Sequence, residues 1–199
     1  MIASLLPPGL SGAELRDTGQ KLGLHPGEEA IIARAAEKRS RDFAMGRTCA
    51  RAALAPLGHG GAAIAMGADG APHWPAGLVG SITHTGGYAA AVAGQAASFS
   101  GVGVDAERVG GVTRKLWPRL FNAVEQAQLA ARTDADVAAT LLFSAKEAAF
   151  KAWRLKGALA FRDIAIALRE DGFTADHAGE NLHGRYAVEG DLVLTLAWF

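Results

Sequence analysis

Two acidic residues in one short segment show where this chain could do chemistry. Asp105 and Glu107 lie two positions apart in Gly103-Val104-Asp105-Ala106-Glu107. Residues two apart in an extended strand point to the same face, so the two carboxylates should lie side by side. At about 4 Å and an effective dielectric near 20, such a pair costs about 4 kcal/mol before screening. A cation or a basic partner would offset that cost, and two solvated acids at an exposed strand end are the ordinary alternative.

A second chemical segment, Phe143-Ser144-Ala145-Lys146-Glu147-Ala148-Ala149-Phe150-Lys151, is expected to lie on a helix. The range Thr140–Lys156 is rich in alanine and contains no glycine or proline, and Gly157 then predicts the end of the helix. At about 100° per residue, Glu147 and Lys151 share one helix face. The ordinary interpretation of these two residues is an exposed ion pair worth about 0.3–0.5 kcal/mol.

Lys146 falls on a different side of the expected helix from Glu147. Its neighbours there are Leu142, Phe150 and Trp153. The ordinary interpretation is that its methylene groups cover apolar surface while the ammonium group reaches solvent.

The two segments predict a metal site if they lie next to each other in the folded protein. With Glu147 packed across from the strand of Asp105 and Glu107, three carboxylates would form a hard-oxygen site suited to Mg²⁺ (or Mn²⁺), completed by waters and a substrate phosphate. Lys146 and Lys151 would then flank the bound phosphate.

Other polar residues could bind phosphate as well. His84 ends an expected strand at a glycine turn, close to the hydroxyl of Ser81. Arg39 and Arg47 lie on nearby faces of an expected helix, and guanidinium groups match phosphate oxygens. A lone histidine is more often structural, and helix arginines usually line a solvated face, so both interpretations stay open at this point.

Composition limits the class of protein. The chain has 199 residues, a formal net charge of zero and a single cysteine, Cys49. A neutral balance argues against a nucleic-acid-binding protein, and one cysteine permits no internal disulfide and suits a reducing compartment. No segment is long and apolar enough to cross a membrane, and the N-terminus lacks the basic and apolar regions of a signal peptide. We therefore expect a cytoplasmic protein that does not associate with membranes.

The order of expected elements indicates an α+β fold with two similar halves, residues 1–102 and 103–199. Residues 9–25 are expected to form a loop. The expected helices are a segment from Pro26 to Leu57 with a break near Ser40, then Thr113–Leu120, Ala123–Ala131 and Thr140–Lys156. The expected strands are Ala62–Met66, Val79–Thr83, Tyr88–Gly94, Val102–Ala106, Phe161–Leu168, Phe173–Ala175, Tyr186–Glu189 and Leu192–Phe199.

Taken together, the two chemical segments resemble those of the 4′-phosphopantetheinyl transferases, and most closely the surfactin-synthetase and enterobactin-synthetase type. Three further segments strengthen the resemblance: the basic run from Lys38 to Arg51, the stretch from Trp74 to His84, and Phe121-Asn122-Ala123-Val124-Glu125. Each motif alone is weak, but five in the correct order and spacing are specific.

This resemblance implies a monomer with a pseudo-twofold fold, in which each half has a long helix packed on a small, mainly antiparallel sheet. It implies coenzyme A phosphate contacts in the N-terminal half, and a metal site and carrier docking in the C-terminal half. The metal ligands it implies are Asp105, Glu107 and Glu147. The coenzyme A contacts it implies are Arg39, Arg47, Ser81, His84, Lys146 and Lys151.

The activity implied by the resemblance is a magnesium-dependent transfer. The 4′-phosphopantetheine group passes from coenzyme A to a serine of an apo acyl, peptidyl or aryl carrier protein, and adenosine 3′,5′-bisphosphate is released. Asp105, Glu147 and Lys151 would be the catalytic residues, with Glu147 or a metal-held water as the base. A non-catalytic coenzyme A or metal-binding relative and a magnesium-dependent phosphohydrolase are the alternatives.

Overall fold

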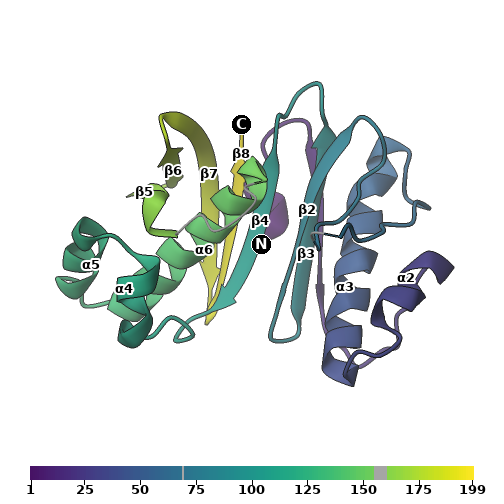
Figure 1. The fold of residues 1–199 in the computed structure, drawn as a ribbon, viewed down its shortest axis with the longest axis horizontal. Coiled ribbons are helices and arrows are strands. Elements are labelled where there is room, and N and C mark those ends of the chain that lie inside the picture. Colours follow the sequence, from purple (N-terminus) through teal and green to yellow (C-terminus); the bar gives the residue numbers. More distant parts are fainter. Residues whose placement is uncertain (69, 155–160) are drawn as a thin grey trace.

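The computed structural model describes residues 1–68, 70–154 and 161–199, and it has an α+β fold built on two antiparallel sheets (Figure 1). Each sheet carries one long helix, so the predicted class, a pseudo-twofold fold of two similar halves, is confirmed. All strands of the first sheet precede residue 96, and all strands of the second follow residue 101.

The first sheet has the strand order β1-β3-β2. Its strands are β1 (Leu10–Arg16), β2 (Leu78–Thr85) and β3 (Tyr88–Gln95). Helix α3 (Glu37–Leu54) packs on one face of this sheet. The residues of β3 on that face are the buried alanines Ala89, Ala91 and Ala93, whose small side chains let the helix approach closely.

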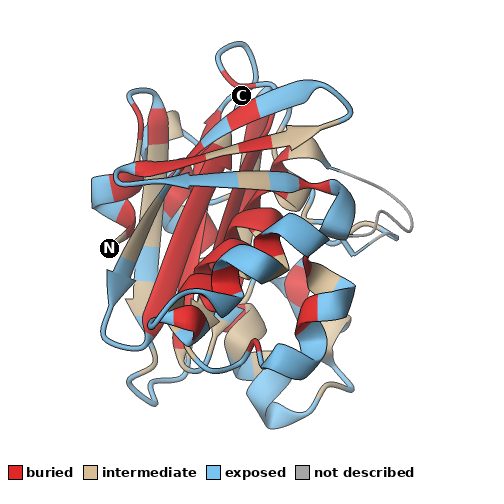
Figure 2. Ribbon diagram, turned by 90° about the vertical axis from the view of Figure 1, so that its left-hand side faces the viewer, coloured by how far each residue is buried: buried red, intermediate tan, exposed pale blue. Residues whose placement is uncertain are grey.

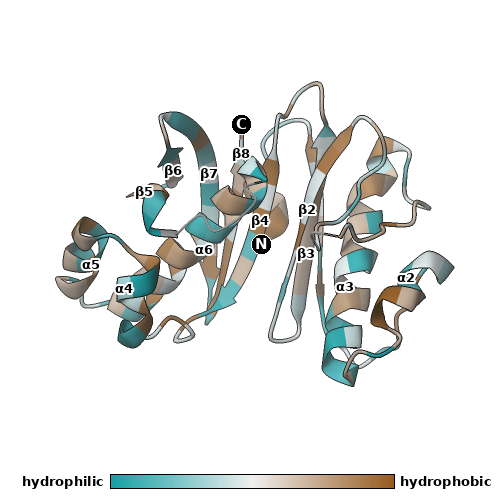
Figure 3. Ribbon diagram, in the orientation of Figure 1, coloured by the Kyte–Doolittle hydropathy of each residue, from teal (hydrophilic) through white to brown (hydrophobic). Residues whose placement is uncertain are grey.

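The second sheet has the strand order β4-β8-β7-β6-β5. Its strands are β4 (Val102–Arg108), β5 (Ala165–Arg169), β6 (Gly172–His177), β7 (Glu180–Glu189) and β8 (Leu192–Trp198). Helix α6 (Ala135–Trp153) packs mainly on β4 and β8. Both α3 and α6 alternate between hydrophobic and hydrophilic residues along their length (Figure 3), as expected for helices with one face on a sheet.

Shorter elements connect these parts. They are the helices α1 (Ile2–Leu5), α2 (Pro26–Ile32), α4 (Trp117–Leu120) and α5 (Ala123–Ala130), and the 3₁₀ turns η1 (Ala55–Leu57), η2 (Arg114–Leu116) and η3 (Phe161–Asp163). Within the described ranges, none of the helices combines the length and the apolar character that a bilayer crossing requires.

The two sheets share one hydrophobic core. Val92 of β3 packs in the same cluster as Val104 of β4 and Leu194 of β8. Buried residues accordingly fill the strands at the centre of Figure 2, whereas the outer helices carry the exposed ones. The two halves therefore form one packed unit.

Side-chain hydroxyls join the sheets where β2 meets β4. The backbone N–H of Val104 donates to Ser81 Oγ at 3.0 Å, and that of Ala106 donates to Thr83 Oγ1 at 3.0 Å. The free edge of β4 thus meets the side chains of β2, which fixes the position of Asp105 relative to the first half.

The structure corrects several predicted boundaries. The expected loop at residues 9–25 contains strand β1, and the expected strand Ala62–Met66 is an irregular segment with one isolated bridge from Met66 to Pro72. Backbone groups of Ile64 bond to side chains there: its N–H donates to Glu28 Oε1 and its carbonyl accepts from Arg47 Nε, both at 2.9 Å.

Helix boundaries differ from the prediction as well. The first predicted break lies after Ile32 and not near Ser40. The central helix begins earlier than predicted, at Ala135, and ends at Trp153, where Arg154 adopts a left-handed φ of 50°. The predicted stop at Gly157 and the Asp69 position of a predicted turn lie outside the described residues.

Helix α6 lies unusually close to β4 because the strand residues beneath it are glycine. A Cβ atom on Gly103 would come within 1.9 Å of the carbonyl oxygen of Ala148, and one on Gly101 within 2.1 Å of that of Ala152. Both contacts are with helix backbone, which cannot rotate away as a side chain could. Glycine at these positions therefore sets the distance between α6 and β4.

We expect Gly103→Ala to lower the free energy of unfolding by about 3 kcal/mol or more, because the new methyl group forces the helix off the strand. Urea unfolding of both proteins measures the change. Gly27→Ala is the control: no atom lies within 4 Å of its added Cβ, and in helix α2 the change should be neutral or stabilising by about 0.5–1 kcal/mol. Equal unfolding curves for the two variants would show that α6 can shift without cost.

Candidate active site

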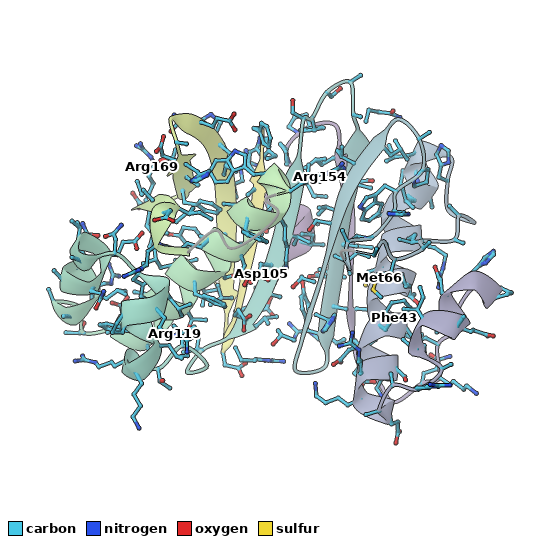
Figure 4. All side chains as sticks on the ribbon, in the orientation of Figure 1. Phe43, Met66, Asp105, Arg119, Arg154 and Arg169 are labelled. Atoms are coloured by element: carbon cyan, nitrogen blue, oxygen red, sulfur yellow. The ribbon has the colours of Figure 1, made fainter. Side chains whose placement is uncertain are left out.

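Asp105 on β4 is the centre of a polar cluster between the two halves, and Figure 4 labels it there. Its side chain is 4% exposed. Lys151 Nζ donates to Asp105 Oδ1 at 2.8 Å and also to the carbonyl oxygen of Val104 at 3.0 Å. Ser144 Oγ donates to Asp105 Oδ2 at 2.9 Å, and a longer contact of 3.4 Å joins Thr83 Oγ1 to Oδ1. Both oxygens of this buried carboxylate are thus held by specific partners.

Glu107 and Glu147 complete the acidic group. Burial above all, together with the negative charges of Asp105 and Glu147, raises the pKa of Glu107 to about 7, against the opposing effect of Lys151. Burial also raises the pKa of Glu147, with Asp105 acting in the same direction and Lys151 against it. The three acids and Lys151 therefore interact as one electrostatic group, as the sequence predicted for a strand and a helix that face each other.

The acids are close enough to repel but do not already chelate an ion. Among the described residues, no three His, Cys, Asp or Glu side chains converge tightly enough to hold a metal as they stand. Lys151 supplies the positive charge against Asp105 in this arrangement. Three carboxylates with unrelieved repulsion are nevertheless the donor set that a hard divalent cation prefers. The chemistry of these three side chains therefore suits such an ion.

A pocket of about 550 Å³ lies in the first half, between α3, the end of β2 and the segment around Met66. Figure 4 labels Phe43 and Met66 beside α3 in this region. Arg39 lines the pocket and is exposed, as are its neighbours on the same helix turn. Arg47 lines it from below: it is 6% exposed, and its guanidinium carbon lies 4.2 Å from the centre of the Phe43 ring. The pocket thus combines apolar walls with fixed positive charge.

His84 connects the pocket to the acidic group. It lines the pocket at the end of β2, and its Nδ1 lies 3.9 Å from Asp42 Oδ2. Burial lowers the pKa of His84, and the positive charges of Lys151, Lys38 and Arg39 lower it further, against the opposing effect of Asp42. Thr83, the residue before His84 on β2, contacts Asp105 Oδ1 at 3.4 Å, so the pocket and the cluster at Asp105 adjoin.

Two predicted contact residues lie elsewhere. Lys146 is fully buried, and its Nζ donates to Glu125 Oε2 at 2.7 Å. Glu125 in turn caps α5 by accepting from the N–H of Asn122, so this pair fastens α5 to α6. The expectation that Lys146 covers an apolar surface with its ammonium group in solvent is therefore wrong, and the structure does not bring Lys146 to the acids.

Ser81 is the other residue that the structure places differently. It is 5% exposed, and its hydroxyl is engaged with the backbone of Val104 between the sheets. Its position is that of a spacer between the halves and not of a pocket-lining residue.

Sequence reasoning missed two residues of the cluster. Thr83 contacts Asp105 from the first half, and Thr195 bonds to Ser144 from strand β8. The hydroxyl-rich run around His84 pointed towards the first of them. No sequence signal pointed towards Thr195, which becomes significant only because β8 pairs with β4.

Comparison with known proteins shows the family to which the chain belongs. A model described as the 4′-phosphopantetheinyl transferase N-terminal domain matches residues 27–94, and one described as the 4′-phosphopantetheinyl transferase superfamily matches residues 101–197. The chain is 39% identical over 192 residues to the 4′-phosphopantetheinyl transferase Npt of Nocardia iowensis, covering 96% of this chain and 86% of that protein. This chain belongs to the 4′-phosphopantetheinyl transferase superfamily.

Other members of the superfamily show comparable similarity. The transferase PptT of Mycobacterium tuberculosis is 35% identical over 218 residues, covering 98% of this chain and 96% of PptT. Enterobactin synthase component D of Escherichia coli is 36% identical over 140 residues, covering 69% of this chain and 66% of that protein. The family predicted from the five motifs is confirmed.

The metal-free protein should become less stable as the pH rises from about 4.5 to 7. Glu107 in the unfolded chain titrates near its ordinary pKa of 4.5, whereas in the folded protein it keeps its proton to about 7. The folded state therefore binds more protons in this window, and the free energy of unfolding falls with rising pH. The contribution of Glu107 is at most about 3 kcal/mol.

Urea unfolding between pH 4 and 8 in the presence of a chelator measures this effect. Glu107→Gln should flatten the profile, whereas Glu180→Gln, at an exposed residue of β7, should leave it unchanged. If the free energy of unfolding fell as steeply with rising pH in Glu107→Gln as in the wild type, other titratable groups would be responsible for the effect.

Proposed function

We propose that this protein transfers the 4′-phosphopantetheine group from coenzyme A to a serine hydroxyl of an apo carrier protein. One observation carries the proposal. A basic, partly apolar pocket in the first half lies next to the acidic cluster with Lys151 in the second half. A nucleotide with several phosphates needs the first feature, and phosphoryl transfer needs the second.

Coenzyme A would bind with its adenosine end in the pocket. Arg39 is exposed at the pocket wall and free to adopt a bidentate geometry with the 3′-phosphate, whereas Arg47 is held at the floor by its bond to Ile64. The pyrophosphate would then extend past His84 towards Lys151. This places coenzyme A contacts in residues 1–102 and leaves residues 103–199 for the metal site and the carrier.

Asp105, Glu107 and Glu147 would hold a magnesium ion. When bound, the ion would neutralise charge on the phosphoryl oxygens and relieve the repulsion among these acids. Lys151, which already lies against Asp105, would place a second positive charge beside the transferred phosphate. Lys146 has no part in this step, because it is buried against Glu125.

The transfer needs no reactant besides coenzyme A and the carrier serine. The carrier serine oxygen forms a bond to the β-phosphorus of coenzyme A, the bond from that phosphorus to the bridging oxygen breaks, and adenosine 3′,5′-bisphosphate leaves with the electron pair. The serine proton must pass to a base. Glu147 is our candidate because of its place in the acidic group with Asp105 and Lys151.

A direct test is to incubate the protein with coenzyme A, magnesium and a purified apo acyl carrier protein or apo peptidyl carrier domain, and to weigh the carrier by mass spectrometry. We expect a gain of one phosphopantetheine group. Free phosphopantetheine without the adduct would indicate a hydrolase, and neither product would indicate a binding protein. Asp105→Asn should abolish the adduct, whereas Asp136→Asn, at an exposed residue of α6, should not.

Arg39→Ala should weaken binding of coenzyme A far more than binding of dephospho-coenzyme A, because only the former carries the 3′-phosphate. A bidentate, charge-assisted contact is worth about 1.5–3 kcal/mol. Calorimetric titration of both ligands measures the difference. Arg41→Ala is the matched control, since Arg41 lies on the same helix but pairs with Glu37 and Asp17. Equal losses for both ligands in Arg39→Ala would remove this role.

A further inference from the structure

A chain of buried hydroxyl groups supports Asp105 from behind. Ser144 of α6 and Thr195 of β8 are both fully buried. Ser144 Oγ lies 2.9 Å from Asp105 Oδ2 and 2.9 Å from Thr195 Oγ1. Thr195 is also the residue directly opposite Asp105 in the pairing of β4 with β8. Ser144 of α6 therefore contacts one carboxylate oxygen of Asp105 directly, and Thr195 of β8 contacts Ser144 behind it.

The donor in each hydrogen bond of this series of hydroxyl groups follows from which groups have a proton to donate. Each hydroxyl has one proton to donate, and an ionised carboxylate can only accept. Ser144 must therefore give its proton to Asp105 Oδ2. Thr195 is left as the donor in its contact with Ser144, towards the hydroxyl at 2.9 Å or the backbone carbonyl at 2.9 Å. Either bond ties Ser144 to Thr195, through its hydroxyl or through its backbone carbonyl, and so holds the Ser144 hydroxyl beside Asp105.

The two oxygens of Asp105 consequently have different surroundings. Oδ2 is turned inward, onto the hydroxyl chain. Oδ1 faces Lys151, whose side chain is 29% exposed, and Thr83 of the other half. Oδ1 is therefore the oxygen next to the partly exposed Lys151, whereas Oδ2 is next to buried hydroxyls.

We propose that Ser144 and Thr195 are positioning residues that fix the rotamer of Asp105, so that Oδ1 alone is presented to a divalent cation. The inference rests on the proposed function, in which Asp105 is a metal ligand. Neither hydroxyl contacts the reacting groups. Their effect is to prevent the carboxylate from rotating away, and ligand orientation of this kind typically changes metal affinity by about 10–100-fold.

The test measures Mn²⁺ binding to the purified protein directly, from the electron paramagnetic resonance signal of the free ion, without coenzyme A or carrier. Ser144→Ala should weaken Mn²⁺ binding by at least about 10-fold. Its Michaelis constant for coenzyme A at saturating metal should stay near that of the wild type. Thr140→Val is the matched control: Thr140 is a fully buried hydroxyl residue one turn earlier on α6, and its hydroxyl bonds only to the carbonyl of Asp136 among the contacts described.

A second pair of variants separates positioning from packing at Thr195. Thr195→Val keeps the shape and removes the hydroxyl, whereas Thr195→Ser keeps the hydroxyl and removes a methyl group. Mn²⁺ affinity should fall in the valine variant and be retained in the serine variant, whatever the order of their thermal stabilities. This pair also carries the test if Ser144→Ala does not fold.

The outcomes distinguish this inference from the function on which it rests. Wild-type protein that binds no Mn²⁺ or transfers no phosphopantetheine would overturn the proposed function. Wild-type protein that does both, with unchanged Mn²⁺ binding in Ser144→Ala or in Thr195→Val, would overturn the positioning role alone. If the Mn²⁺ affinity of the variants followed their thermal stability instead of the presence of the hydroxyl group, the positioning role would also be overturned.

Discussion

The contact between helix α6 and strand β4 is the constraint on which the site depends. Because Gly101 and Gly103 have no side chain, the helix backbone rests directly on the strand. Glu147 and Lys151 are carried by the helix and Asp105 and Glu107 by the strand, so this one packing distance sets the separation of each charged pair that joins helix and strand. A larger residue in the strand would separate the charges before it disturbed any of them directly.

In the second half, Lys151 partly offsets the repulsion among the three acids of the cluster. The first half supplies positive charge that could attract a ligand. Lys151 offsets part of the repulsion among three acids, which leaves two of them with a raised pKa. Arg39 and Arg47 are at the pocket on the other side of His84. Under the proposed function, a molecule with phosphates along its length would contact positive charge in the first half and the acidic group with Lys151 in the second, so neither half would suffice alone.

The sequence predicted those parts of the structure that depend on local pattern. Helix α6 and strand β4 followed from alanine content and from alternation, and the meeting of their acids followed from the motifs. Strand β1 was missed because its residues include Gly12 and because its only strand partner, β3, is some 80 positions further on, a relation that local pattern cannot express. The burial of Lys146 was missed for the same reason, since its partner Glu125 lies on a separate helix.

The junction of β2 with β4 has a consequence for the protein in a crowded solution. An edge strand normally presents unpaired N–H and C=O groups that can recruit a strand from another molecule. On the edge of β4, the N–H groups of Val104 and Ala106 are taken by hydroxyls, and the carbonyl of Val104 is taken by Lys151. At β4 the second sheet therefore ends inside the molecule, on an edge whose backbone groups at Val104 and Ala106 are already hydrogen-bonded. Residues that organise the site thus also keep this edge from pairing with a strand of another molecule.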